Sequence, residues 1–188
     1  LASQLRLEGM LDVISKNRSI DLYQTLYSEW RQDKAEAQIY GLLRRWPNTQ
    51  LIWAANDPMA LGALVAAKRR NFRPGDNIHI GGLNWSKKAL QKIKNGDLTV
   101  SVGGHFMLGG WALVMIHDRH RGKDFIDLGL KITIPMGVIT QNNVSTYLNA
   151  FGDENWEKIN FQNFSRIKMK QKFKYNFSIS NILSAIEN

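Results

Sequence analysis

Hydrophobic residues recur every three or four positions in several stretches of the chain, and elsewhere they form short runs or alternate with polar residues. The first spacing predicts helices over residues 3–16, 33–45, 58–67, 87–94, 107–120 and 179–186. The second predicts strands over residues 20–27, 51–55, 78–82, 98–102 and 131–140. Strands that alternate with helices in this way are typical of βαβ units. The sequence therefore predicts an α/β fold, a three-layer sandwich around a parallel sheet, with a mostly irregular C-terminal extension.

The stretch 51–63, LIWAANDPMALGA, combines an apolar run, a polar corner and the start of a helix. The run 51–55 suits a strand buried on both faces. Asp57 is a favoured N-cap residue, and Pro58 suits the first helical position because its missing N–H needs no partner there. Asn56 then lies at the carboxyl end of a strand, the edge where open α/β sheets bind ligands. Its amide suits a ligand with many hydroxyl groups, and bracing of the turn is the equally weighted alternative.

Four other residues, Trp30, Asn84, Trp85 and His105, also follow directly after predicted strands. Because the carboxyl ends of parallel strands meet at one edge of a sheet, we expect these side chains to converge. Aromatic rings stack on the C–H faces of sugars, and amides bind sugar hydroxyls. This pattern predicts a sugar-binding site. Each residue also has a purely structural alternative, in which Trp30 is a core aromatic residue and Trp85 packs under its loop.

Motifs for catalysis, cofactors and metals are absent from the sequence. The glycine-rich segment 103–110 lacks the Gly-Lys-Ser/Thr ending of a phosphate-binding loop. His117 and His120 lie one helical turn apart near Asp118 and Asp124, but two exposed histidines are a more frequent explanation of this spacing than a metal site. The sequence therefore predicts a protein that is not an enzyme and binds neither metal nor cofactor.

Composition adds the class of protein and raises one question about charge. The 188 residues have 44% hydrophobic content, no cysteine and a formal net charge of +9. No apolar run reaches the roughly 20 residues that span a membrane. The absence of cysteine fits an exported protein, and a start at leucine rather than methionine suggests a piece of a longer chain. Basic residues alternate with mostly apolar ones over 166–175, which favours an extended basic edge strand over a nucleic-acid groove.

The string NDPMALGA at 56–63 resembles the periplasmic binding protein type 1 family, which includes ribose- and galactose-binding proteins. Three further segments, 6–9, 80–84 and 96–98, match the family's first helix of the second lobe and two of its strand borders. The resemblance covers about residues 3–140. It implies that residues 1–146 form the C-terminal lobe of a two-lobe protein and that 147–188 form an extended basic tail. It also implies that residues 107–122 pack on the absent N-terminal lobe.

The resemblance implies a periplasmic protein without enzymatic activity, which binds a sugar or sugar-like ligand by hinge closure between its lobes. Such a protein serves an ABC transporter permease or a membrane sensor, with no nucleic acid as partner. The alternative within the family is the ligand-sensing effector domain of a lactose-repressor-like transcription regulator.

The resemblance also carries roles to individual residues. Asn56 matches the family's ligand-bonding asparagine, and Trp30 lies near an aromatic stacking position. Asn84 stands where an aspartate usually binds two hydroxyls, and Gln4 stands where ribose binders have an arginine. His105, or Gly103 beside it, falls near a glutamine or arginine position. Because these charged groups are replaced, a neutral polyol or sugar derivative is a better fit than a charged ligand, and each contact is weaker.

Overall fold

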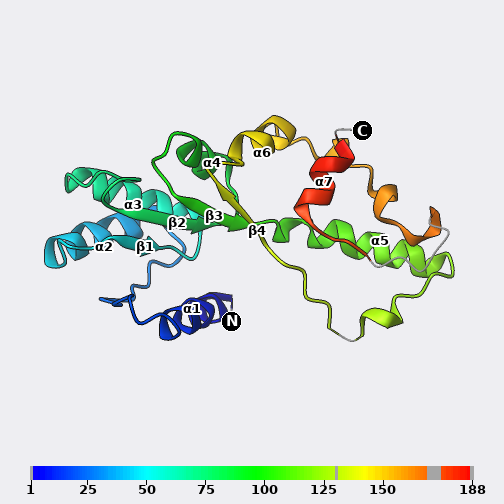
Figure 1. Cartoon of the computed structure of the whole chain (residues 1–188), viewed down its shortest axis with the longest axis horizontal. Helices are drawn as coiled ribbons and strands as arrows, with labels where there is room; N and C mark the ends of the chain where they lie inside the picture. Colours follow the sequence, from blue (N-terminus) through cyan, green and yellow to red (C-terminus); the bar gives the residue numbers. More distant parts are fainter. Residues whose placement is uncertain (1, 130, 169–174, 187–188) are drawn as a thin grey trace. The chain divides into compact units, whose positions relative to one another are not determined.

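A computed structural model describes residues 2–129, 131–168 and 175–186 of the chain (Figure 1). It divides into two compact units, Leu1–Ser101 and Val102–Asn188, which are described separately below. The first unit contains α1 (Ala2–Ser15), α2 (Gln32–Arg45), β1 (Leu51–Trp53), α3 (Asp57–Arg69), β2 (His79–Leu83), α4 (Lys87–Lys94) and the start of β3 (Val100–Gly103). From α2 onward, this order confirms the predicted alternation of helices and strands.

The first unit is built on a parallel sheet. β1 pairs with β2 in parallel, with Ile52 opposite Ile80, and β3 follows β2 in the strand order. α3 packs on β2, and α2 packs along α3, as Figure 1 shows on the light-blue to green part of the chain. The α/β fold class is therefore confirmed. Because the strands are parallel, the carboxyl ends of β1 and β2 lie at the same edge of the sheet.

Close packing between α2 and α3 depends on one glycine. A Cβ atom at Gly62 would collide with the carbonyl oxygen of Gln32 and would lie 2.9 Å from the Glu36 backbone nitrogen. Beneath this pair of helices, the buried core of the first unit is aliphatic: Leu43, Ile52, Leu64, Ile78, Ile80, Leu90 and Ile93. Burial of these side chains is the main favourable contribution to the stability of the unit.

The second unit is organised on one long helix. It contains the end of β3, η1 (His105–Met107), α5 (Leu108–His120), η2 (Ile126–Leu128), β4 (Gly137–Thr140), α6 (Val144–Phe151), η3 (Trp156–Lys158), η4 (Phe161–Phe164), η5 (Arg166–Lys168) and α7 (Ile179–Ile186). The end of β3 has β4 as its neighbour in the sheet. On α5, Trp111 is fully buried and stacks on Phe177 with 5.4 Å between ring centroids. Within the described ranges, no helix has both the length and the apolar character needed to span a membrane.

The predicted strand at 20–27 is wrong, since the structure has no strand there. Leu22 and Tyr27 are exposed, and the ring of Tyr23 stacks on Trp46 with 4.7 Å between centroids. A strand needs a neighbour for its backbone hydrogen bonds, and alternating side chains alone do not supply one. The predicted strand at 131–140 is shorter than expected, because only β4 is regular.

Burial of β1 on both faces was also a wrong prediction. Leu51 is 59% exposed and Trp53 is 38% exposed, while Ile52 between them is buried. β1 pairs with β2 alone in the described residues, so it is an edge strand, and its face with Leu51 and Trp53 is largely open. An apolar run of this length does not distinguish a central strand from an edge strand.

In the C-terminal region, one sequence prediction is wrong and another is confirmed. Residues 166–168 form the 3₁₀ turn η5 rather than the start of an extended segment, and residues 169–174 lie outside the described part of the chain. The predicted helix at 179–186 is confirmed as α7, whereas α6 was not predicted.

Candidate functional site

The site is held together by the buried carboxylate of Asp57 at the start of α3. One carboxylate oxygen accepts a hydrogen bond from the backbone N–H of Ser86 at 2.6 Å, and the other accepts from the hydroxyl of Ser101 at 2.7 Å. The side chain is completely buried, and the helix N-terminus favours its negative charge. Asp57 therefore fixes the loop after β2 and the strand β3 against the beginning of α3.

Asn56, not Asp57, is the N-cap of α3, which corrects the sequence prediction. Its side-chain oxygen accepts from the backbone N–H of Met59 at 2.9 Å, and its Nδ2 donates to the carbonyl oxygen of Trp30 at 3.0 Å. The side chain is 6% exposed. These two bonds correspond to the bracing role that the sequence left open. An amide has a second N–H and further lone pairs, so bracing and ligand binding are compatible.

Two loops at this edge have strained backbones. Glu29 and Trp30 have φ angles of 50° and 63°, and Asn84 and Trp85 have φ angles of 121° and 61°. Non-glycine residues at positive φ are strained, bulky ones most of all, and such strain concentrates at functional sites. The hydrogen bond from Asn56 to Trp30 and the bond from Ser86 to Asp57 bring both loops to the N-terminus of α3.

Asn84 and Trp85 have different environments although they are neighbours in the chain. The indole of Trp85 is 6% exposed and donates to the carbonyl oxygen of Ser101 at 2.9 Å, so its ring packs under the loop. The side-chain oxygen of Asn84 is buried and has no hydrogen-bond partner among the described residues. A buried acceptor without a partner is costly, unless a ligand donates to it.

Trp30 is 41% exposed and has Arg6 as its neighbour. The guanidinium carbon of Arg6 lies 5.3 Å from the centroid of the Trp30 ring, and an Nη atom donates to the carbonyl oxygen of Ala55 at 2.5 Å. In the sequence analysis, Arg6 was identified only within the helix segment 6–9 and was not predicted as a residue of the site. In the sequence, Arg6 is only an arginine beside the apolar positions of a predicted helix. Nothing in that pattern indicates its contacts with Trp30 and Ala55.

The two remaining predicted residues are Gln4, on α1, and His105, in the second unit. Gln4 is exposed on α1, where its amide donates to the carboxylate of Glu8 at 3.0 Å. His105 belongs to the second unit, where it begins η1 directly after Gly104, whose φ is 98°. The first unit therefore brings together Trp30, Asn56 and the loop that carries Asn84 and Trp85, but no contact joins Gln4 to them among the bonds described.

The histidines of α5 show no metal-site geometry. His117 is about half exposed, with Nδ1 at 3.6 Å from a carboxylate oxygen of Asp118, and His120 is exposed. The described ranges contain no group of three or more potential metal-ligating side chains.

An α/β unit with aromatic and amide side chains at the carboxyl edge of its parallel sheet has the arrangement of a small-molecule binding lobe. Comparison with known families agrees with this class. Residues 1–124 match the family described as a periplasmic binding protein domain, and the chain belongs to this family.

Similar proteins and structures include several sugar-binding proteins. A crystal structure of a periplasmic sugar-binding protein from Pseudomonas fluorescens is 36% identical, with a TM-score of 0.85 over 96% of this chain and 55% of that chain. The D-allose-binding periplasmic protein of Escherichia coli is 25% identical over 68% of this chain and 40% of its own length. A fructose import binding protein of Bifidobacterium longum is 27% identical over 56% of this chain and 32% of its own length. The chain thus spans about half the length of these relatives or less.

Proposed function

We propose that this chain is the C-terminal lobe of a periplasmic solute-binding protein and that its carboxyl-edge site binds a neutral sugar or polyol. The observation that carries the proposal is that Trp30 and the loop with Asn84 are both bonded to the start of α3, beside Asn56, in a member of this family. In this proposal the lobe comprises residues 1–146, residues 147–188 are an appended tail, and residues 107–122 pack on an N-terminal lobe.

The polar groups of the site favour an uncharged ligand with hydroxyl groups. The unpaired oxygen of Asn84 can accept a hydrogen bond from a hydroxyl, and the second N–H of Asn56 can donate one. Both carboxylate oxygens of Asp57 already accept bonds from the protein, so Asp57 supports the site without adding a ligand-binding charge. The partly exposed ring of Trp30 suits stacking on the C–H face of a sugar. Gln4, on α1 of the same unit, is a further proposed contact, whereas His105 belongs to the second unit and stays a prediction from the sequence.

The proposed role is binding without chemistry. Ligand contacts divided between two lobes would shift an open–closed equilibrium toward the closed form, which an ABC transporter permease or a membrane sensor would recognise. Trp85, with its indole bonded to Ser101, would support the site from beneath.

The first experiment is a thermal-shift assay of the chain with D-ribose, D-galactose, D-allose and D-fructose, with buffer alone as control. A sugar that binds only the folded state raises the melting temperature, and at ten times its Kd it adds about 1.4 kcal/mol of stability. No shift with any sugar, together with no change in the indole N–H signals of the tryptophans by NMR, would contradict the proposal.

Asn84→Gly separates ligand binding from stability, with Asn71→Gly as its matched control. Both asparagines have positive φ, 121° and 62°, so both substitutions relieve backbone strain. We expect both variants to be as stable as the parent or more stable by up to about 1 kcal/mol. Only Asn84→Gly should weaken sugar binding, by roughly tenfold for the lost hydrogen bond. Equal sugar affinity in both variants would remove Asn84 from the site.

A further inference from the structure

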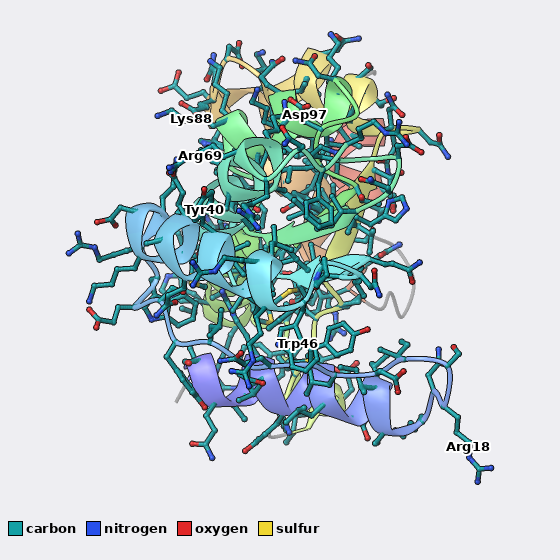
Figure 2. All side chains as sticks on the ribbon, turned by 90° about the vertical axis from the view of Figure 1, so that its left-hand side faces the viewer. Arg18, Tyr40, Trp46, Arg69, Lys88 and Asp97 are labelled. Atoms are coloured by element: carbon teal, nitrogen blue, oxygen red, sulfur yellow. The ribbon has the colours of Figure 1, made fainter. Side chains whose placement is uncertain are left out.

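A cluster of cations lies where α2 and α3 end, far from the candidate sugar site. The ring of Tyr40 on α2 lies 4.7 Å from the guanidinium carbon of Arg69 and 5.1 Å from that of Arg70. Figure 2 shows Tyr40 and Arg69 as neighbours on the face turned to the viewer. Along α3, Arg69 is about 18 Å from Asp57 at 1.5 Å per residue. Arg44 lies one turn beyond Tyr40 on α2 and is exposed.

The ion pairs of this cluster leave it with excess positive charge. Arg69 pairs with Glu36 at 2.7 Å, and Lys68 and Lys92 share the carboxylate of Asp97 at 2.6 and 3.2 Å. Arg44 and Arg70 have no carboxylate ion pair within the described ranges. Five cations therefore stand against two carboxylates. We call Tyr40 and four of these cations, Arg44, Lys68, Arg69 and Arg70, the arginine patch, and Lys92 on α4 is not part of it.

The stacked geometry of the arginine patch suits phosphate groups. A guanidinium that lies over an aromatic ring keeps the N–H donors at its edge available, and that edge binds phosphate oxygens in pairs. Tyrosine has an apolar ring and a polar hydroxyl, a combination that is enriched where proteins meet the membrane–water interface. Together these features match a surface of phosphate headgroups better than a single buried anion.

We propose that the arginine patch binds the anionic phospholipid surface of a membrane and so holds the protein near it. The choice of lipid over nucleic acid rests on the proposed periplasmic location, and it is otherwise independent of sugar binding. The competing explanation is internal, since cations at helix C-termini stabilise the helix dipole. That explanation predicts no affinity for vesicles.

The test is co-sedimentation of the full chain with vesicles of phosphatidylcholine alone, or of two parts phosphatidylcholine and one part phosphatidylglycerol. We expect binding to the anionic vesicles only, and loss of binding at about 0.5 M salt because screening shortens the reach of the charges. The double variant Arg44→Gln/Arg70→Gln should bind roughly 25-fold more weakly, about fivefold for each basic residue near the surface. Arg18→Gln/Arg121→Gln removes the same charge outside the patch and should bind nearly as well as the parent.

Several outcomes would overturn the proposal. Equal binding to both vesicle types would point to exposed apolar residues, and an equal loss in the two double variants would point to net charge. Absence of binding to anionic vesicles would leave the helix dipole as the explanation. Tighter, patch-dependent binding of a duplex oligonucleotide would assign the patch to nucleic acid. Because Arg44→Gln/Arg70→Gln should leave the sugar response intact, failure of one proposal is distinguishable from failure of the other.

Discussion

Asp57 in the first unit and Asp118 in the second are both completely buried carboxylates, but they join very different parts of the chain. Asp57 binds Ser86 and Ser101, which lie in the loop after β2 and in β3, so it connects neighbouring βα segments at the candidate site. Asp118 accepts hydrogen bonds from the Ser165 hydroxyl, from the Arg166 backbone N–H at 2.7 Å and from the Tyr175 hydroxyl at 2.8 Å. It therefore attaches the C-terminal segment to α5.

The positions of the two carboxylates on their helices explain why they need different partners. Asp57 is in the first turn of α3, where the helix dipole favours a negative charge, and Asp118 is in the last turn of α5, where the dipole opposes one. Burial raises the pKa of Asp118, but the hydrogen bonds from Ser165, Arg166 and Tyr175 outweigh it and hold the pKa below its ordinary value. A carboxylate against the dipole is thus stable only with several donors from a distant segment.

Arg166 strengthens the attachment in the second unit. Its guanidinium binds both carboxylate oxygens of Asp127 at 2.8 Å, and its central carbon lies 4.2 Å from the centroid of the Tyr175 ring. In the first unit, the buried charge of Asp57 thus positions the loops of the candidate site. In the second unit, the buried charge of Asp118 binds the C-terminal segment to α5.

Asp57→Ala should have the largest effect on stability. It leaves the Ser86 N–H and the Ser101 hydroxyl without their acceptor in a buried place, and we expect a loss of about 3–5 kcal/mol in the free energy of unfolding. Urea unfolding measures this loss. The control is Asp76→Ala, at an exposed carboxylate that pairs with Arg73, and it should cost less than about 1 kcal/mol. Similar small losses in both variants would contradict the role given to Asp57.

Asp118→Asn should destabilise the second unit by about 2–3 kcal/mol, because the amide places a donor opposite donors of the C-terminal segment. Amide hydrogen exchange should accelerate in residues 159–167 and 175–182, while the first unit keeps its protection. Asp124→Asn, at an exposed carboxylate paired with Arg119, serves as the control. Faster exchange throughout the chain would show that Asp118 supports more than the attachment.

The hydrogen bonds of Asp118 should also make the stability of the protein depend on pH in acid. The pKa of Asp118 is lowered in the folded protein, so its contribution to stability is complete above the ordinary pKa of about 4 and is lost as the pH falls through the folded value. We expect the difference in stability between the parent and Asp118→Asn to shrink as the pH drops below about 4. A difference that stays constant across this range would contradict the assignment.

Gly62→Ala and Gly110→Ala should have the smallest effects on stability. The two effects should differ between the first and the second unit. A Cβ at Gly62 would meet backbone atoms of α2, which cannot move alone, whereas a Cβ at Gly110 would lie 2.6 Å from the ring of Phe161, which can turn. After the gain in helix propensity, Gly62→Ala should cost about 1–2 kcal/mol and Gly110→Ala less than about 0.5 kcal/mol. Thermal unfolding of both variants tests this order, and the reverse order would show that the second unit is the more tightly packed.

The sequence was informative wherever the signal was local. The pattern at 51–63 predicted the strand, the corner and α3, and the apolar spacing predicted a helix over 87–94, which is α4. The sequence was misleading where either of two adjacent residues could be the N-cap of a helix. Asn56 and Asp57 are both good N-cap residues, and the buried donors of Ser86 and Ser101 decide which of them caps the helix.

By itself, the sequence determined the alternation of helices and strands from α2 onward, and with it the edge at which the residues that follow β1 and β2 lie. This is so because hydrophobic period and turn chemistry act within a few residues, and parallel connections place all strand ends on one side. Tertiary structure alone decided that residues 20–27 form no strand, that Trp85 turns inward, that Arg6 reaches Trp30, and that Asp118 holds the C-terminal segment. Each of these depends on atoms contributed by distant segments, for which the neighbouring sequence carries no signal.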